Sequence, residues 1–136
     1  MKLLTKDTDY AIRLVLSLVG KGSGFVSVRQ ISIEERIPYY FLRRIAKRLI
    51  EEKVLESKEG VCGGVKLVKS PSKISLSDMI KIFQGDLKLS ECMFRKKLCH
   101  NRPKCVLRKE IKRIERVVEV EFKRLTVQTL IDKLGK

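Results

Sequence analysis

Residues 38–53, PYYFLRRIAKRLIEEK, restrict the fold of this chain more than any other stretch, because they form a helix with two opposed sides. Successive residues of a helix are rotated by about 100°, which separates the aliphatic residues from the cations. One side carries Leu42, Ile45, Ala46 and Leu49, and the opposite arc carries Tyr40, Arg43, Arg44, Lys47 and Arg48. With Pro38 in its first turn, this helix is expected to pack on a core and to face an anionic partner.

Two helices are expected before this basic helix. The stretch TKDTDYAIRLVLSLVGKGSG, residues 5–24, repeats apolar residues with helical spacing and then ends at glycines. The stretch SVRQISIEERI, residues 27–37, has Ser27 as its expected N-cap and Gln30 three residues later, which is the pattern of a capping box. Its inward-facing residues are expected to be Val28, Ile31 and, after a bend, Ile37.

After Lys53 the pattern changes from helical to β-prone. Two short runs, residues 54–57 and 65–68, flank Gly60, Gly63 and Gly64, which indicates a hairpin with an irregular tip. Helix, short helix, basic helix and hairpin, in that order, make a winged helix-turn-helix. In this architecture the basic helix is the candidate recognition helix and the hairpin is the wing.

The second half of the chain predicts three more helices. Ser77 is the expected N-cap of a helix that carries Met79, Ile80 and Phe83 and stops at Gly85. A longer helix has an apolar stripe with steps of three and four residues: Leu107, Ile111, Ile114, Val118, Phe122 and Leu125. Such a stripe lines either a two-helix seam or a contact within one chain. We favour a dimer interface, because the winged helix already has its own core; TVQTLIDKL is expected to form a short closing helix.

The expected fold is therefore mainly α with a small β-wing, in one compact domain. Residues 1–75 form the winged helix-turn-helix DNA-binding region, and residues 76–136 form a cysteine loop and the dimerisation helices. No apolar run is long enough to span a bilayer and no signal peptide is visible, so no membrane association and a cytoplasmic location are expected.

The net charge of +15 points to an anionic partner. Residues 1–75 carry 15 cations against 8 acids and residues 76–136 carry 16 against 8, so the excess is spread along the chain. Nucleic acid or an anionic membrane would suit such a domain, and solvated basic faces without a partner are the plainer alternative. RNA is less favoured than DNA, because no ribonucleoprotein-type aromatic motif or GxxG clamp stands in the right context.

Residues 91–105, ECMFRKKLCHNRPKC, bring Cys92, Cys99 and Cys105 into one short segment. In a reducing compartment thiols are more often free or metal-bound than bridged. Three thiolates suit an iron–sulfur cluster and leave one ligand to be supplied. Structural zinc with His100 and thiol redox switching without metal are the alternatives. Cys62, expected at the wing tip, is interpreted as an incidental small residue.

The sequence does not indicate an enzyme. No Ser–His–Asp set, phosphate-binding glycine loop or carboxylate pair stands out, and a single histidine limits acid–base chemistry. A cysteine-based redox enzyme would more often have a CxxC pair, which is absent.

Nearly the whole chain resembles the Rrf2 family of bacterial transcriptional regulators. The matching stretches are TDYAIRLVLSLV, VRQISIEERIPYYFLRRIAKRLIEEKVLESKEG, GGVKLVKSPSKISLSDMIKIFQG, the three cysteines and TVQTLIDKL. The resemblance implies a homodimeric repressor or activator that dimerises through the long helix and binds a pseudo-palindromic operator. The expected DNA contacts are Ser27, Tyr39, Tyr40, Arg43, Arg44, Lys47 and Arg48, with Lys58, Gly63, Gly64 and Lys66 of the wing.

The expected DNA contacts differ in the part of the DNA that they bind. Arg43 and Arg44 are expected at base edges in the major groove, and Lys47 and Arg48 at phosphates. The family's wing often carries Arg where this chain has Glu59, and an aromatic residue where it has Val65. Since the minor groove repels an acid, Lys58 or Lys66 is expected to make the wing contact.

The resemblance also bears on the cysteines, because in the cluster-sensing members, such as those like IscR and NsrR, three cysteines hold an iron–sulfur cluster. Members like IscR have cysteines five residues apart and a histidine three positions after the last. Here the first gap holds six residues and Arg108 occupies that histidine's place, so His100 is a candidate substitute.

Members like NsrR complete the ligand shell with an aspartate from the partner subunit, and Asp9 matches that position. Ligation by His100 would favour a 2Fe–2S centre, and ligation by Asp9 would permit 4Fe–4S. The alternative is a cofactor-free member controlled by thiol oxidation, a small ligand or a partner protein.

Overall fold

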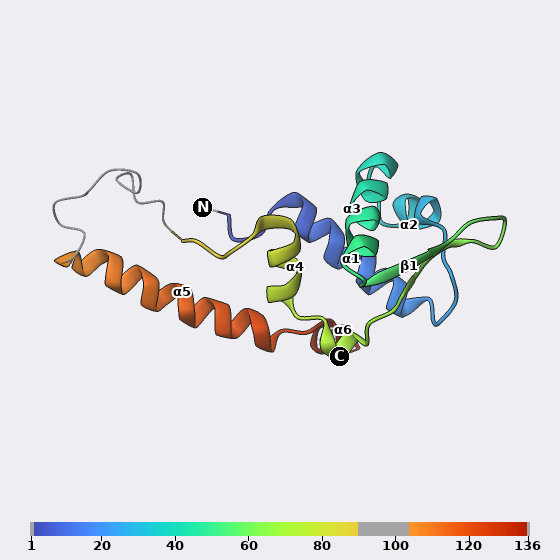
Figure 1. The fold of residues 1–136 in the computed structure, drawn as a ribbon. Helices are drawn as coiled ribbons and strands as arrows, with labels where there is room; N and C mark the ends of the chain where they lie inside the picture. The colour runs from blue at the N-terminus through green and yellow to red at the C-terminus, as the bar shows by residue number, and fades with distance from the viewer. Residues whose placement is uncertain (1, 90–103, 136) are drawn as a thin grey trace.

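The structure, a computed structural model, describes residues 2–89 and 104–135 (Figure 1). Over these ranges the chain is mainly helical with one antiparallel hairpin, which confirms the predicted fold class. The elements are α1 (Lys6–Gly20), α2 (Val28–Glu34), α3 (Tyr39–Glu51), β1 (Leu55–Lys58), β2 (Gly64–Leu67), the 3-10 turn η1 (Pro71–Lys73), α4 (Leu76–Gln84), α5 (Val106–Arg124) and α6 (Val127–Leu134).

The core lies where α1, α2, α3 and the hairpin meet. The buried residues of α3 are Leu42, Ile45, Ala46 and Leu49, the aliphatic side that the periodicity predicts. Ile31 and Ile37 are buried as expected, and Leu14 of α1 joins them with no exposed surface. The cations of α3 therefore face outward, because its other side is fully used in packing.

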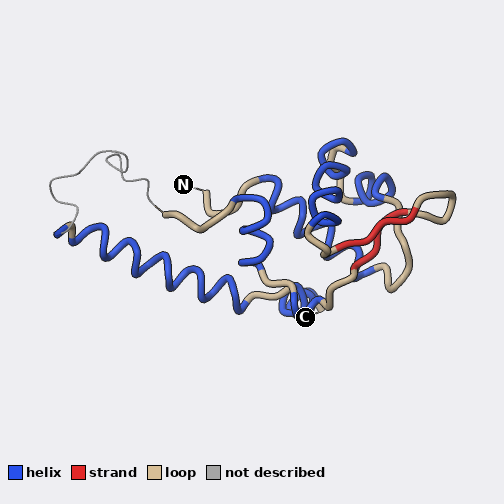
Figure 2. The backbone as a smooth tube through the Cα atoms, in the orientation of Figure 1, coloured by secondary structure: helices blue, strands red, loops and turns tan. Residues whose placement is uncertain are grey.

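The hairpin extends away from the helical body as a wing (Figure 2). Its register pairs Leu55 with Leu67 and Lys58 with Gly64. Val26, which precedes α2, adds a single bridge to Val65 through two backbone hydrogen bonds of 2.9 Å. This bridge holds β2 of the wing against the residues that precede α2.

The N-cap of α2 is predicted correctly but its capping box is not formed, and the predicted N-cap of α4 is wrong. Ser27 does stand at the N-cap position of α2, but its side chain makes no capping hydrogen bond, and Gln30 instead donates to Glu34 at 3.0 Å. Helix α4 is capped by Ser75 rather than by Ser77, which is buried within the helix.

The start of α4 has a local signal, because Ser75 and Asp78 have the spacing of a capping box, and a tertiary contact is added to it. Ser75 is extended because it forms a β-bridge with Thr126, so the helix begins after it. The Ser75 hydroxyl then accepts from the Asp78 N–H, and the Asp78 carboxylate accepts from the Ser75 N–H, each at 3.0 Å. Likewise Pro38 is the N-cap of α3 and not a residue of its first turn.

Helix α5 leaves the body beside α4 and runs to the end of the molecule opposite the wing, whereas α6 packs back on η1 and α1 (Figure 1). No residue of α5 is buried. In the predicted stripe, Leu107 is 71% exposed and Ile114 is 39% exposed. Within one chain, two of the six stripe residues are therefore exposed and the other four are half-buried. No helix among the described residues is long and apolar enough to cross a membrane.

Gly64 is required by the backbone where β2 begins, next to the tip of the wing. Its φ is +143°, and a Cβ there would collide with the carbonyl group of Val26. Gly63 is equally restricted, since a Cβ would collide with the carbonyl oxygen of Lys58. Gly60, at φ +108°, has open space around it.

We expect Gly64→Ala to lower the free energy of unfolding by more than Gly60→Ala. Both alanines would adopt a left-handed backbone at a cost of about 1–3 kcal/mol, but only the first also breaks the Val26–Val65 bridge. Urea unfolding of the two variants would test this. Equal losses would mean that the bridge does not restrain the wing.

Candidate nucleic-acid interface and metal site

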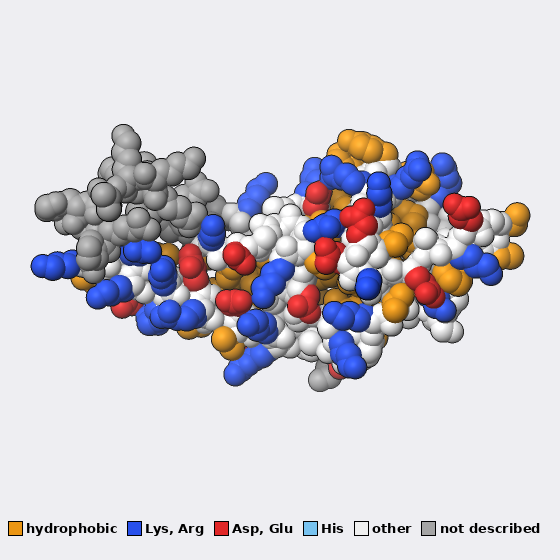
Figure 3. All heavy atoms as spheres, viewed as in Figure 1, with side chains coloured by type: hydrophobic (Ala, Val, Ile, Leu, Met, Phe, Trp, Pro, Cys, Tyr) orange, Lys and Arg blue, Asp and Glu red, His pale blue; other side chains and the backbone are white. Residues whose placement is uncertain are grey.

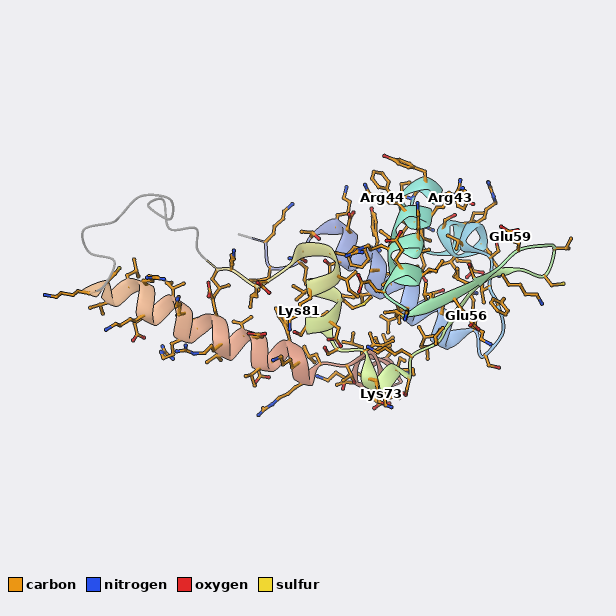
Figure 4. All side chains as sticks on the ribbon, viewed as in Figure 1. Arg43, Arg44, Glu56, Glu59, Lys73 and Lys81 are labelled. Atoms are coloured by element: carbon orange, nitrogen blue, oxygen red, sulfur yellow. The ribbon has the colours of Figure 1, made fainter. Side chains whose placement is uncertain are left out.

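The outer side of α3 carries the predicted cations in exposed positions. Lys and Arg side chains gather over α3 and along α5, with acidic side chains between them (Figure 3). Arg43 and Arg44 project from α3 (Figure 4). Tyr40, in the first turn of the same helix, is 67% exposed. These residues form one accessible surface, as the sequence predicts.

Ion pairs divide the cations of α3 into two kinds. Arg44 Nη2 lies 3.0 Å from a carboxylate oxygen of Asp7, which belongs to α1. Arg48 lies within 3.5 Å of Glu51 and 3.1 Å of Glu52. Among the described residues, Arg43 and Lys47 form no ion pair. Arg43 and Lys47 are therefore more readily available to an anionic partner than Arg44 and Arg48.

Aromatic residues fix the start of α3. The guanidinium of Arg29, on α2, lies 4.3 Å from the centre of the Tyr39 ring. The rings of Tyr40 and Phe41 are 4.4 Å apart. Such cation–π and aromatic contacts orient the first turn of α3 relative to α2.

A surface ion pair also ties α2 to the end of α1. Lys21 and Glu34 approach to 2.6 Å, and this contact, together with the hydrogen bond from Gln30, lowers the pKa of Glu34. Ser27 is exposed at the start of α2, beside an open hollow toward the wing. Its hydroxyl makes no capping bond to α2.

The wing carries cations and acids on the same strands. Lys66 pairs with Glu56 on the opposite strand at 3.1 Å, whereas Lys58 forms no ion pair with another described residue. Both ammonium groups lie near the ring of Phe25, at 5.8 Å for Lys58 and 5.1 Å for Lys66. Lys58 is therefore the less neutralised of the two predicted wing contacts. Gly63 and Gly64 are explained by close backbone approach, whatever their role toward DNA.

The predicted metal ligands are placed only in part. Cys92, Cys99 and His100 lie outside the described residues. Cys105 is the half-buried N-cap of α5, and its Sγ accepts from the backbone N–H of Arg108 at 3.5 Å. Asp9 lies in the first turn of α1 and pairs with Arg13 at 3.0 Å.

Asp9 and Cys105 do not come together within one chain. Cys105 begins α5 at the end of the molecule far from the winged helix, whereas α1 lies inside the body (Figure 1). Within the described ranges, no three His, Cys, Asp or Glu side chains gather as a metal site. Cys62 is exposed at the wing tip, as predicted.

Both described ends of the cysteine segment lie on α5. On one side Leu89 donates its N–H to the Glu115 carboxylate at 2.9 Å, and on the other Cys105 caps the helix. These attachment points are ten residues apart, or about 15 Å along a helix. Lys81 and Glu119, 3.9 Å apart, hold α4 beside α5 in the same region (Figure 4).

Comparison with known proteins decides the family. The model of the Rrf2 family, described as an iron-dependent transcriptional regulator, matches residues 4–133. The chain belongs to the Rrf2 family. The predicted resemblance is confirmed, and the protein is a DNA-binding transcriptional regulator rather than an enzyme. Regulators of this family commonly act as dimers.

Individual relatives and structures agree with this assignment. The regulator NsrR of Shouchella clausii is 33% identical over 107 residues, which cover 77% of this chain and 72% of NsrR. The structure of CymR, the global cysteine regulator of B. subtilis, is similar with a TM-score of 0.81 and 20% identity over 98% of each chain. T. potens IscR follows with a TM-score of 0.77 and 18% identity, over 98% of this chain and 88% of IscR. The two structures support the winged-helix fold.

We expect Lys47→Ala to weaken DNA binding more than Arg48→Ala. Lys47 forms no ion pair with another described residue and is able to replace counterions at a phosphate, whereas Arg48 is already balanced by two glutamates. Losing one phosphate contact should lower the slope of log affinity against log salt by about one unit for every sequence. Anisotropy titrations at several salt concentrations measure this slope; a larger loss for Arg48→Ala would contradict the assignment.

Proposed function

We propose that this protein is a homodimeric regulator that senses redox, nitric oxide or iron–sulfur status through a cluster on Cys92, Cys99 and Cys105. The observation that carries the proposal is the attachment of the cysteine segment to α5 at both described ends. A signal that changes this segment would act directly on the helix that we assign to the dimer. The family description as iron-dependent and the similarity to NsrR support the same reading.

Cys105 suits a thiolate ligand by its position. Its sulfur faces the N-terminus of a long helix, where backbone N–H groups favour negative charge. It is half-buried, so partial exclusion of water is already in place. A bound iron–sulfur cluster would supply a redox-responsive centre whose potential depends on such hydrogen bonds.

The fourth ligand would come from a different place in each alternative. Asp9 is remote from Cys105 within one chain, so it would reach the cluster only across the dimer, after release from Arg13. His100 is next to Cys99 in the sequence and would serve its own chain. The first choice permits a 4Fe–4S centre and the second favours 2Fe–2S.

DNA recognition would use α3 in the major groove and the wing beside it. Arg43, which has no ion-pair partner within residues 2–89 and 104–135, would bind a guanine with its fork, at a contribution of roughly 1–3 kcal/mol. Lys58 would enter the minor groove in place of the arginine that the family often carries. Two copies joined through α5 would engage two half-sites about one helical turn apart.

A cofactor-free regulator is the second candidate. CymR is the global cysteine regulator of B. subtilis, and its structure superposes on this chain over almost its whole length. In that case the same thiols would respond to oxidation, a small ligand or a partner protein without holding a metal.

We expect Ile114→Glu to produce monomers and to abolish tight operator binding. A charge buried against a partner helix costs roughly several kcal/mol when nothing pairs with it. Val120→Glu is the matched control, because Val120 lies on α5 outside the stripe and is 48% exposed. Sedimentation equilibrium distinguishes the two. If Ile114→Glu stays dimeric, the stripe is not the dimer interface.

We expect anaerobically reconstituted protein to hold near-stoichiometric iron and sulfide with visible absorption, and Cys99→Ala to lose both. Cys62→Ala is the control and should retain them, since Cys62 stands at the wing tip. Separate Asp9→Ala and His100→Ala variants identify the fourth ligand by the change in the spectrum. If wild-type protein binds zinc or no metal, and the three cysteine variants bind DNA normally, the cluster proposal is wrong.

A further inference from the structure

The Asp7–Arg44 ion pair joins the recognition helix to α1. Arg44 Nη2 donates to both oxygens of the Asp7 carboxylate, at 3.0 and 3.1 Å. The two residues are 37 positions apart, so the pair is a tertiary contact and not part of either helix's own stability. Both side chains remain partly exposed, 55% for Arg44 and 39% for Asp7, which leaves the pair open to exchange with another anion.

This contact turns Arg44 toward α1 and away from the middle of the cationic arc. On the helical wheel, Arg44 lies between Tyr40 and Arg48, on the edge that faces α1 and α4. To reach a base or a phosphate, its guanidinium must leave the Asp7 carboxylate. DNA phosphates approaching Asp7 would also be repelled by its charge. Asp7 therefore competes with DNA for Arg44.

Gln84, the last residue of α4, holds the backbone on both sides of Asp7. Its Oε1 accepts from the Thr5 N–H at 3.0 Å and from the Thr8 hydroxyl at 2.6 Å. Its Nε2 donates to the Leu3 carbonyl oxygen at 3.1 Å. Thr8 is fully buried, so packing fixes the position of its hydrogen bond with Gln84.

The end of α4 also borders the ion pair itself. A hollow of about 260 Å³ is lined by Asp7 and Arg44 together with Ile45, Arg48, Ile82 and Phe83. After Gln84 the chain turns at Gly85, with φ +76°, and continues toward the cysteines. A displacement of this turn would therefore reach Asp7 through Gln84 and the first turn of α1.

We propose that Asp7 sets the affinity of this regulator for DNA by withholding Arg44, and that Gln84 positions Asp7 for this task. Because Gln84 precedes the cysteine segment, a change in that segment would release or hold Arg44. This inference rests on the proposed function, which assigns α3 to the major groove and the cysteines to sensing.

The test is a double-mutant cycle between Asp7→Asn and Arg44→Ala. The probes are a mixed-sequence duplex and an operator selected from random DNA by the wild-type protein, with affinity measured by anisotropy. Asp7→Asn should bind both probes about 2- to 5-fold more tightly at low salt, as expected for removal of an exposed ion pair. In the Arg44→Ala background the same change should have little effect. Asp7→Glu, which keeps the charge, should stay near wild type.

Two results would overturn the role of Asp7. An equal gain in both backgrounds would mean that Asp7 merely repels phosphates. A loss of affinity that depends on Arg44 would mean that Asp7 supports Arg44 in a DNA-bound position. Arg43→Ala separates this inference from the proposed interface: if it binds DNA like wild type, the assignment of α3 is wrong, whereas a loss there with no effect of Asp7→Asn contradicts only the inference.

Gln84→Ala tests the second half of the proposal. It should raise DNA affinity in the same direction as Asp7→Asn, and the two changes together should give no more than the larger one alone. Thermal unfolding verifies that each variant is folded at the assay temperature. If Gln84→Ala and Asp7→Asn add fully, or if Gln84→Ala leaves affinity unchanged in a folded protein, Gln84 does not position Asp7.

Discussion

A short backbone bridge between residues 74–76 and 125–127 determines how the two halves of this regulator are joined. Leu76 donates its N–H to the Leu125 carbonyl at 2.7 Å, and Val127 donates to the Ile74 carbonyl at 2.8 Å. Ile74 and Val127 are both buried, so the bridge is protected from water. It fixes the start of α4 and the end of α5 at one point. From there α5 can extend away from the body while remaining rigidly connected to it, which is what a dimer of DNA-reading heads requires.

The net charge and the local ion pairs of this protein have different effects on its attraction to DNA. The charge of +15 makes the domain attractive to DNA at a distance. At the surface of α3, however, Arg44 and Arg48 are balanced by acids, and Lys66 on the wing is balanced by Glu56. Each pair is exposed and contributes at most about 1 kcal/mol, so DNA phosphates can displace the acids. On the proposed interface, this arrangement would lower affinity for DNA in general without preventing specific contacts.

Sequence periodicity predicts the sides of α3 correctly because helical rotation is a local property. The four residues expected to be buried are the four that the structure buries. The N-cap at Ser27 is also predicted correctly, whereas α4 begins not after Ser77 but after Ser75, where the local capping box with Asp78 is combined with a bridge to Thr126, fifty-one positions away. The role of Asp7 could not be predicted from the sequence, because its partner Arg44 is 37 positions away. Asp7 reads as an ordinary acid in the first turn of a helix, and nothing local connects it to Arg44.

Some features of the candidate site could likewise be predicted from the sequence, and others depend on the folded structure. Exposed cations on α3 follow from their spacing, whereas which of them are free depends on folded neighbours. The glycines of the wing could be recognised as turn residues, but only the structure gives the carbonyl groups that exclude a Cβ at Gly63 and Gly64. Two of the three predicted cysteine ligands and His100 lie outside the described residues, so their roles stay predictions.

The free energies of the contacts limit how strongly a signal from the cysteines could change DNA binding. Coupling between sites is typically about 1–3 kcal/mol. An exposed pair such as Asp7–Arg44 can supply up to about 1 kcal/mol per subunit, and a dimer contains two such pairs. Release of Arg44 would thus account for the lower part of that range at most. A larger response would require a change in the spacing of the two α3 helices, and α5 is the element that both described ends of the cysteine segment contact.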